Sequence, residues 1–151
     1  MSNIAKKQAR DRFIRGMAQI LVPLGVPQTA ARLYGYLLLN DGPVSLDRIV
    51  AELEISKSTA SVAARLLEMY TLVRRSGQRG SRRILFEASD DYNAMINSQK
   101  RSLEQLAALI HEGARTSSSR KTRARLKTMA DFYLLNRNAM ESVQRAWSER
   151  Q

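Results

Sequence analysis

Hydroxyl and cationic side chains are concentrated in one stretch of the chain, SKSTASVAAR, at residues 56–65. Small hydroxyl residues are only moderate helix formers, but they are favourable at the residue that begins a helix. We therefore expect Ser56 to cap a helix over 57–70. The residues after it can donate hydrogen bonds to phosphates and base edges, or contact a thymine methyl group. The candidate contact residues are Ser56, Lys57, Ser58, Thr59, Ser61, Val62 and Arg65.

A second cationic group follows at residues 74–83, which hold five arginines and no acidic residue. Two short apolar runs, 72–73 and 84–88, flank this glycine-containing segment, and together they predict a β-hairpin with a projecting loop. Arginines without a neighbouring acid are expected to require an anion. The negative potential of the DNA minor groove attracts arginine. The candidate residues are Arg74, Arg75, Arg79, Arg82 and Arg83.

The residue types that catalysis and metal binding usually require are scarce. His111 is the single histidine and the sequence has no cysteine, so multi-histidine and thiolate metal sites are excluded. The sequence also lacks a glycine-rich phosphate loop, ligands at metal-binding spacing, and a paired nucleophile and base. We expect a protein that is not an enzyme and has no catalytic residue, metal or cofactor.

Composition agrees with a nucleic-acid partner. The 151 residues carry a net charge of +11, and 44% of them are hydrophobic, which is enough for a folded core. The longest stretch without a charge, 16–31, contains two prolines and two glycines and is too interrupted to cross a membrane. No signal-peptide core precedes the first basic residues. These features predict a cytoplasmic, nucleoid-associated protein without a membrane partner.

The spacing of apolar residues predicts helices in the rest of the chain. In the 57–70 segment, Ala60, Ala63, Ala64 and Leu67 fall on one face, and their small size allows a neighbouring helix to approach closely. A short helix over 46–53 precedes it across the tight connection Glu54–Ile55, which predicts a helix-turn-helix. Followed by the hairpin, this is a winged helix. The other predicted helices are 5–24, 29–40, 91–113 and 120–148.

The stretch that begins LGVPQTAARLYG, continues through SLDRIVAELEISKSTAS and ends after the arginine-rich hairpin resembles the MarR superfamily of bacterial winged-helix regulators. In pattern it follows the GbsR-like branch, from about residue 13 to residue 90. The resemblance implies a sequence-specific DNA-binding transcriptional regulator of the repressor type. Two positions depart from the family pattern. Thr71 stands where a glycine usually ends the recognition helix, and Ala64 stands where a larger residue is usual.

The resemblance also implies a homodimer that binds double-stranded DNA at a near-palindromic operator. The expected fold is mainly α (α+β), with residues 1–27 forming an N-terminal dimerisation helix. Residues 28–90 would form the winged helix-turn-helix, and 91–151 the C-terminal dimerisation helices. Asn136 could set the register of the paired helices. The alternative is an intramolecular helical hairpin in a monomer. The candidate dimerisation residues are Phe13, Met17, Met129, Tyr133, Asn136, Met140, Val143 and Trp147.

Three questions stay open at this point. Members of the family often carry a small-molecule effector site, and the rings of this chain either cage a quaternary ammonium group or pack in the core and dimer. Residues 115–127 hold six basic residues and no acid. This segment is a second DNA contact, a contact for an acidic effector, or a solvated surface. The alternative function is a winged-helix interaction module for protein or RNA, or an architectural protein without sequence preference. The rings are Phe13, Tyr34, Tyr36, Tyr92, Phe132, Tyr133 and Trp147.

Overall fold

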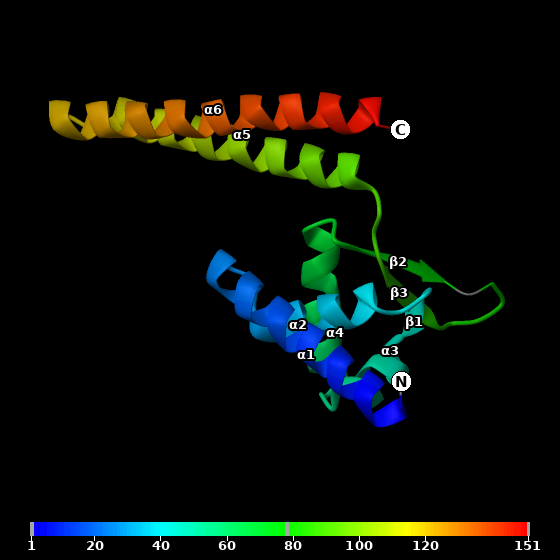
Figure 1. Ribbon diagram of the computed structural model, residues 1–151. Helices are drawn as coiled ribbons and strands as arrows, with labels where there is room; N and C mark the ends of the chain where they lie inside the picture. The colour runs from blue at the N-terminus through cyan, green and yellow to red at the C-terminus, as the bar shows by residue number, and fades with distance from the viewer. Residues whose placement is uncertain (1, 78, 151) are drawn as a thin grey trace. The chain divides into compact units, whose positions relative to one another are not determined.

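The computed structural model describes residues 2–77 and 79–150, which form two compact units. The N-terminal unit is Met1–Asp90 and the C-terminal unit is Asp91–Gln151. Figure 1 shows the elements of each unit. No helix in the described ranges combines the length and the apolar character needed to cross a membrane.

The N-terminal unit combines helices with a small sheet. The three strands are all antiparallel, in the order β1-β3-β2. Strand β1 was not expected, because its two residues are too few to give a periodic signal; it forms because buried Val44 pairs with Phe86 of β3. The elements are α1 (Asn3–Leu21), the short 3-10 helix η1 (Val22–Leu24), α2 (Gln28–Leu38), β1 (Val44–Ser45), α3 (Leu46–Leu53), α4 (Lys57–Met69), β2 (Val73–Gly77) and β3 (Ile84–Ala88).

The core of this unit is centred on α2, whose Leu33, Tyr36 and Leu37 are buried. The small residues of α4 allow close packing, since Ala60, Ala63 and Ala64 belong to the same core cluster. Helix α1 lies against α2 at Gly35, where an added Cβ atom would be 3.3 Å from the Cα atom of Ile14. Helix α1 therefore packs within the same unit as the helix-turn-helix.

Side-chain caps define the starts of the two helices of the helix-turn-helix. The hydroxyl of Ser45 accepts the backbone N–H of Arg48 at 3.2 Å, and the hydroxyl of Ser56 accepts that of Thr59 at 3.1 Å. Between the helices, Glu54 adopts a left-handed backbone conformation with φ of 54°. This allows the N–H of Ile55 to bond the carbonyl of Val50 at 3.3 Å, which closes the tight turn.

The end of α4 is fixed in the same manner. Thr71 has a φ of 61°, and the N–H of Leu72 donates to the carbonyl of Leu67 at 3.0 Å. The carbonyl of Leu72 in turn accepts the N–H of Ser89, just after β3, at 2.9 Å. Leu72, which directly precedes β2, is therefore hydrogen-bonded both to the last turn of α4 and to the residue that follows β3. The departure at Thr71 does not move the end of the helix, because this threonine takes the left-handed conformation that a glycine usually takes there.

The C-terminal unit is a hairpin of two long helices, α5 (Tyr92–Thr116) and α6 (Arg120–Glu149), which lie side by side in Figure 1. Asp91 and Ser119 cap their starts. The expected end of α5 at Gly113 was wrong, because the helix continues to Thr116, whose hydroxyl donates to the Gly113 carbonyl at 2.8 Å. Gly113 instead faces α6, where an added Cβ atom would lie 3.8 Å from a methyl group of Leu126.

Polar groups contribute much of the contact between α5 and α6. Arg137 lies 2.6 Å from Glu104, Lys100 lies 3.5 Å from Glu141, and Gln144 donates to Asn97 at 2.9 Å. The side of α6 that carries these groups differs from the side that carries Met129, Asn136 and Val143, which are exposed. The described buried residues of this unit are Ile96, Ala107 and Ala130.

Candidate nucleic-acid interface

The two faces of α4 differ sharply in exposure and in chemistry. Ala60, Ala63, Ala64 and Leu67 on the inner face are each at most 4% exposed. The outer face carries the predicted contact residues: Lys57, Ser58, Thr59 and Arg65 are exposed, Ser61 is half-buried and Val62 is 67% exposed. The fold therefore leaves this set free on the surface while it packs the other side of the same helix.

The hydroxyl groups at the start of α4 form a small network. Ser56 accepts the backbone N–H of Thr59, donates to the Thr59 hydroxyl at 2.7 Å, and lies 3.2 Å from the Ser58 hydroxyl. Ser56 therefore acts first as a cap. Because Thr59 accepts in this pair, its own hydroxyl proton is available to an outside acceptor.

The arginines of the hairpin fall into two groups. Arg74 donates to Glu87 at 2.8 Å, and Arg75 lies 3.5 Å from Glu68. The expectation that the arginine run lacks compensating acids was wrong for these two, because the acids come from β3 and α4, outside the run. The other arginines, Arg79, Arg82 and Arg83, are exposed and make no ion pair within the part of the chain that the structure describes.

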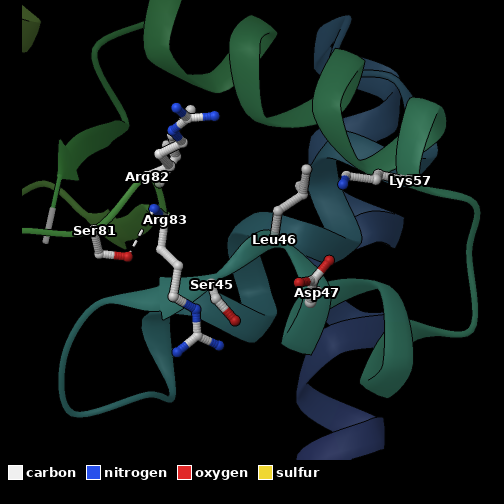
Figure 2. A pocket seen from close by; sticks show the side chains of 8 residues that line it. Ser45, Leu46, Asp47, Lys57, Ser81, Arg82 and Arg83 are labelled. Atoms are coloured by element: carbon white, nitrogen blue, oxygen red, sulfur yellow. Dashed lines mark hydrogen bonds between the residues drawn. The ribbon is translucent and has the colours of Figure 1, made fainter.

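Figure 2 shows a groove between the starts of α3 and α4 and the hairpin. Its cavity volume is about 340 Å³. Arg82 and Arg83 lie on one side of this groove, and Lys57 and Asp47 lie on the other. The three cations can hold phosphate oxygens, whereas the Asp47 carboxylate repels them. Sequence reasoning did not include Asp47 in the site, because nothing local relates the first turn of α3 to the hairpin.

Helix α1 is tied to the helix-turn-helix by ionic contacts. Arg10 of α1 donates to one carboxylate oxygen of Glu52 at 2.9 Å, and Arg48 donates to the other at 2.9 Å. The hydrogen bond from Arg48 lowers the pKa of Glu52, against the opposing effect of burial. The guanidinium of Arg10 also lies 5.5 Å from the centre of the Tyr36 ring. Burial, with the negative charge of Glu52, raises the pKa of that phenol.

The candidate dimerisation residues lie partly at the surface. Phe13 is 39% exposed, and Met17 is half-buried beside Gly35. On α6, Met129, Asn136 and Val143 are exposed, while Tyr133, Met140 and Trp147 are half-buried. The side-chain amide of Asn136 donates to the carbonyl of Phe132 in its own helix at 2.8 Å.

The aromatic residues do not gather in one place within either unit. Tyr36 is fully buried in the N-terminal core. In the C-terminal unit, Tyr92 meets Trp147 edge-on with ring centres 5.1 Å apart, and Phe132 meets Tyr133 at 5.5 Å. These are ordinary packing geometries. Among the described residues, no group of three or more His, Cys, Asp and Glu side chains is arranged to hold a metal.

Comparison with known proteins finds transcriptional regulators among the proteins that this chain resembles. The chain is 31% identical over 88 residues to the HTH-type transcriptional repressor GbsR of Bacillus subtilis (strain 168), covering 58% of this chain and 48% of the repressor. The predicted resemblance to the GbsR-like branch is confirmed. The chain is also 28% identical over 86 residues to YvaV of the same organism, by its name an HTH-type regulator, covering 57% of this chain and 49% of YvaV. No protein-family model matches the chain.

The fold has a solved counterpart. A crystal structure of a transcriptional regulator superposes with a TM-score of 0.85 at 23% identity and covers 93% of this chain and 99% of that one. The predicted fold class, a mainly α winged helix with long C-terminal helices, is confirmed. The chain spans about half the length of the curated relatives it matches. Both relatives are named as transcriptional regulators.

Proposed function

We propose that this protein is a sequence-selective, DNA-binding transcriptional regulator of the repressor type. The observation that carries the proposal is the outer face of α4, where Lys57, Ser58, Thr59, Val62 and Arg65 are exposed beside an arginine-bearing hairpin. In a helix-turn-helix, the start of the second helix enters the major groove and its side chains reach base edges. A protein with this activity would be found on the nucleoid.

Within this proposal, the residues divide by role. Arg65 reaches a guanine edge or a phosphate, Val62 meets a thymine methyl group, and the hydroxyls of Ser58, Thr59 and Ser61 contact bases or phosphates. Lys57, with Arg82 and Arg83 across the groove of Figure 2, holds the phosphate backbone. Arg79 extends the hairpin contact into the minor groove, while Arg74 and Arg75 act mainly through their ion pairs with the protein.

We also infer that the protein acts as a homodimer on a near-palindromic operator. The support is an apolar strip on α6, here called the α6 outer stripe, which helical geometry places along one side of the helix. Within it, Phe132 is 59% exposed and Leu135 is 67% exposed, which is unfavourable for a helix that stays in water. A second copy would cover it. The stripe consists of Met129, Phe132, Leu135, Ala139, Val143 and Ala146.

Release of DNA by a small-molecule effector stays a prediction. A cavity of about 570 Å³ between α1 and the start of α2 offers a place for one. Arg15 and Arg32 line it and make no ion pair within the described ranges, so an anionic compound would suit it better than a quaternary ammonium.

The test is a selection of binding sites from random duplex DNA, followed by anisotropy titrations of the selected duplex and a scrambled duplex. We expect a preference of at least about 1,000-fold for the selected site. Ser58→Ala with Arg65→Gln should remove most of this preference. Arg101→Gln, on the surface of α5, is the charge-matched control.

Binding to both duplexes with equal affinity would overturn the proposal in favour of an architectural role. Failure to bind any duplex would favour the interaction module for protein or RNA.

A further inference from the structure

The turn between α5 and α6 carries the densest unpaired positive charge in the C-terminal unit. Six exposed cations surround it, and residues 113–128 include no carboxylate. Five lie in the first turns of α6 and one lies at the end of α5, so both helices contribute. We call this surface the hairpin tip; it consists of Arg115, Arg120, Lys121, Arg123, Arg125 and Lys127.

The charge at the hairpin tip contrasts with the middle of the same hairpin. There Lys100 pairs with Glu141, and Arg137 pairs with both Glu104 and Glu141. At the hairpin tip, by contrast, Arg123 donates a hydrogen bond to the backbone carbonyl of Ser117 at 2.9 Å. Cations in the first turn of α6 also repel the positive end of the helix dipole, and that turn has no acidic residue. Such a surface gains stability when an anion neutralises it.

We propose that the hairpin tip binds the phosphate backbone of duplex DNA. This inference rests on the proposed function. The residue types favour a nucleic acid, since arginine, lysine, serine and threonine make most phosphate contacts, and five hydroxyl residues are interleaved with the cations. An acidic protein partner fits less well, because protein interfaces are centred on apolar or aromatic side chains. Between residues 115 and 125 the apolar residue is Ala124 alone.

The length of the hairpin sets the scale of this contact. The 25 residues of α5 span about 37 Å at about 1.5 Å per residue. One turn of duplex DNA is about 34–36 Å long. The hairpin tip is therefore separated from the opposite end of the same hairpin by about the length of one turn of duplex DNA.

The test compares two triple variants of the full chain. The tip variant carries Lys121→Gln, Arg125→Gln and Lys127→Gln, and it keeps Arg123, which bonds the turn. The charge-matched control carries Arg101→Gln, Arg145→Gln and Arg150→Gln in the same unit. Each is titrated from 50 to 300 mM salt with two duplexes. One is trimmed to the selected site and the other is extended by about one turn at each end. Circular dichroism checks that both variants keep their helices.

We expect the slope of log affinity against log salt to become shallower by about two to three for the tip variant, since each phosphate that the protein no longer neutralises removes about 0.9. The control should keep the slope of the unmodified protein. A change on the extended duplex alone would support a contact with flanking DNA, and a change on both duplexes a contact within the operator. Equal slopes for the tip variant and the control would overturn the inference and leave an acidic protein as the partner.

The two proposals can fail separately. If the unmodified protein prefers its selected site and the tip variant behaves as the control does, the regulator proposal stands and the tip contact is wrong. If the unmodified protein shows no preference but the tip variant loses salt dependence, the tip contact stands and the regulator proposal is wrong.

Discussion

Arg10 and Glu52 join α1 to the first helix of the helix-turn-helix across a 2.9 Å ion pair. The same carboxylate accepts a hydrogen bond from Arg48, four residues before it in α3. Glu52 therefore has a cation on each side, one from its own helix and one from the N-terminal helix. The contact couples a helix expected to join two protomers to the element expected to hold DNA.

The first prediction concerns this ion pair. A double-mutant cycle with Arg10→Ala and Glu52→Ala should give a coupling energy of about 0.5–1 kcal/mol in urea unfolding, because both side chains are partly exposed. The pKa of Glu52 is below its ordinary value, so its stabilisation is complete above that value and is lost as the pH falls through the lowered pKa. Glu52→Gln should remove this acid-side loss. Additive single-mutant effects would contradict the prediction.

The second prediction concerns the end of α4. Thr71 is a β-branched residue with a φ of 61°, a conformation that costs an L-residue about 1–2 kcal/mol and glycine almost nothing. After allowance for the greater freedom of glycine in the unfolded chain, Thr71→Gly should raise the free energy of unfolding by about 0.5–1 kcal/mol. Thr71→Val should lower it, since it keeps the strain and loses the hydroxyl that donates to the Tyr70 carbonyl. A glycine variant less stable than the parent would contradict this reading.

The third prediction separates the two groups of hairpin arginines. Neutralising Arg79, Arg82 and Arg83 to glutamine should make the salt dependence of DNA binding shallower by about 0.9 for each phosphate that is no longer neutralised, with little change in stability. Neutralising Arg74 and Arg75 should have a smaller effect on that slope. It should instead lower stability by up to about 1 kcal/mol for each pair, because it leaves Glu87 and Glu68 without their partners. Titrations and urea melts on the same samples distinguish the groups, and equal slopes would show that the division is wrong.

The fourth prediction concerns Asp47. Its carboxylate lines the groove of Figure 2 with Lys57, Arg82 and Arg83, where it would repel a phosphate. Asp47→Asn should strengthen DNA binding several-fold at low salt. It should also destabilise the protein by about 0.3–1 kcal/mol, because a negative charge in the first turn favours α3. Asp131→Asn on α6 is the control with the same charge change, and it should leave affinity unaltered. Weaker binding by Asp47→Asn would show that the groove does not face DNA.

The fifth prediction concerns the α6 outer stripe. Leu135→Asp places a charge at its middle and should dissociate the dimer, as measured by sedimentation at micromolar concentration. Asn138→Asp makes the same helix more negative at an exposed position outside the stripe and should leave the dimer intact. A parent protein that sediments as a monomer, or a Leu135→Asp variant that remains dimeric, would place the dimer contact elsewhere.

Local signals made part of this fold predictable from the sequence. The caps Ser45 and Ser56 each depend on a few adjacent residues, and the structure has them where the pattern indicates. The exposed face of α4 follows from helical periodicity alone. Longer-range relationships could not be read in this way. The pairing of Arg74 with Glu87 depends on the register of β2 against β3, and the place of Asp47 depends on how the hairpin meets α3.

The long helices illustrate a second limit. Gly113 is a plausible stop signal, but α5 continues through it to Thr116, and Gly113 faces Leu126 of α6. On α6, an alternating pattern of three and four residues fits more than one face. The apolar residues indicate one face, while the ion pairs and amide bonds of Arg137, Glu141 and Gln144 select another for the contact with α5.

The hydrogen bonds of Leu72 have a mechanical consequence. Its N–H is bonded to the end of α4 and its carbonyl to the residue after β3, so these two bonds restrain the angle between the helix and the hairpin. On DNA, α4 and the hairpin would therefore keep a nearly constant distance from each other. Binding would then depend on the spacing of adjacent grooves as well as on the bases. A duplex of the right sequence would bind poorly if its local groove width did not match the distance between α4 and the hairpin.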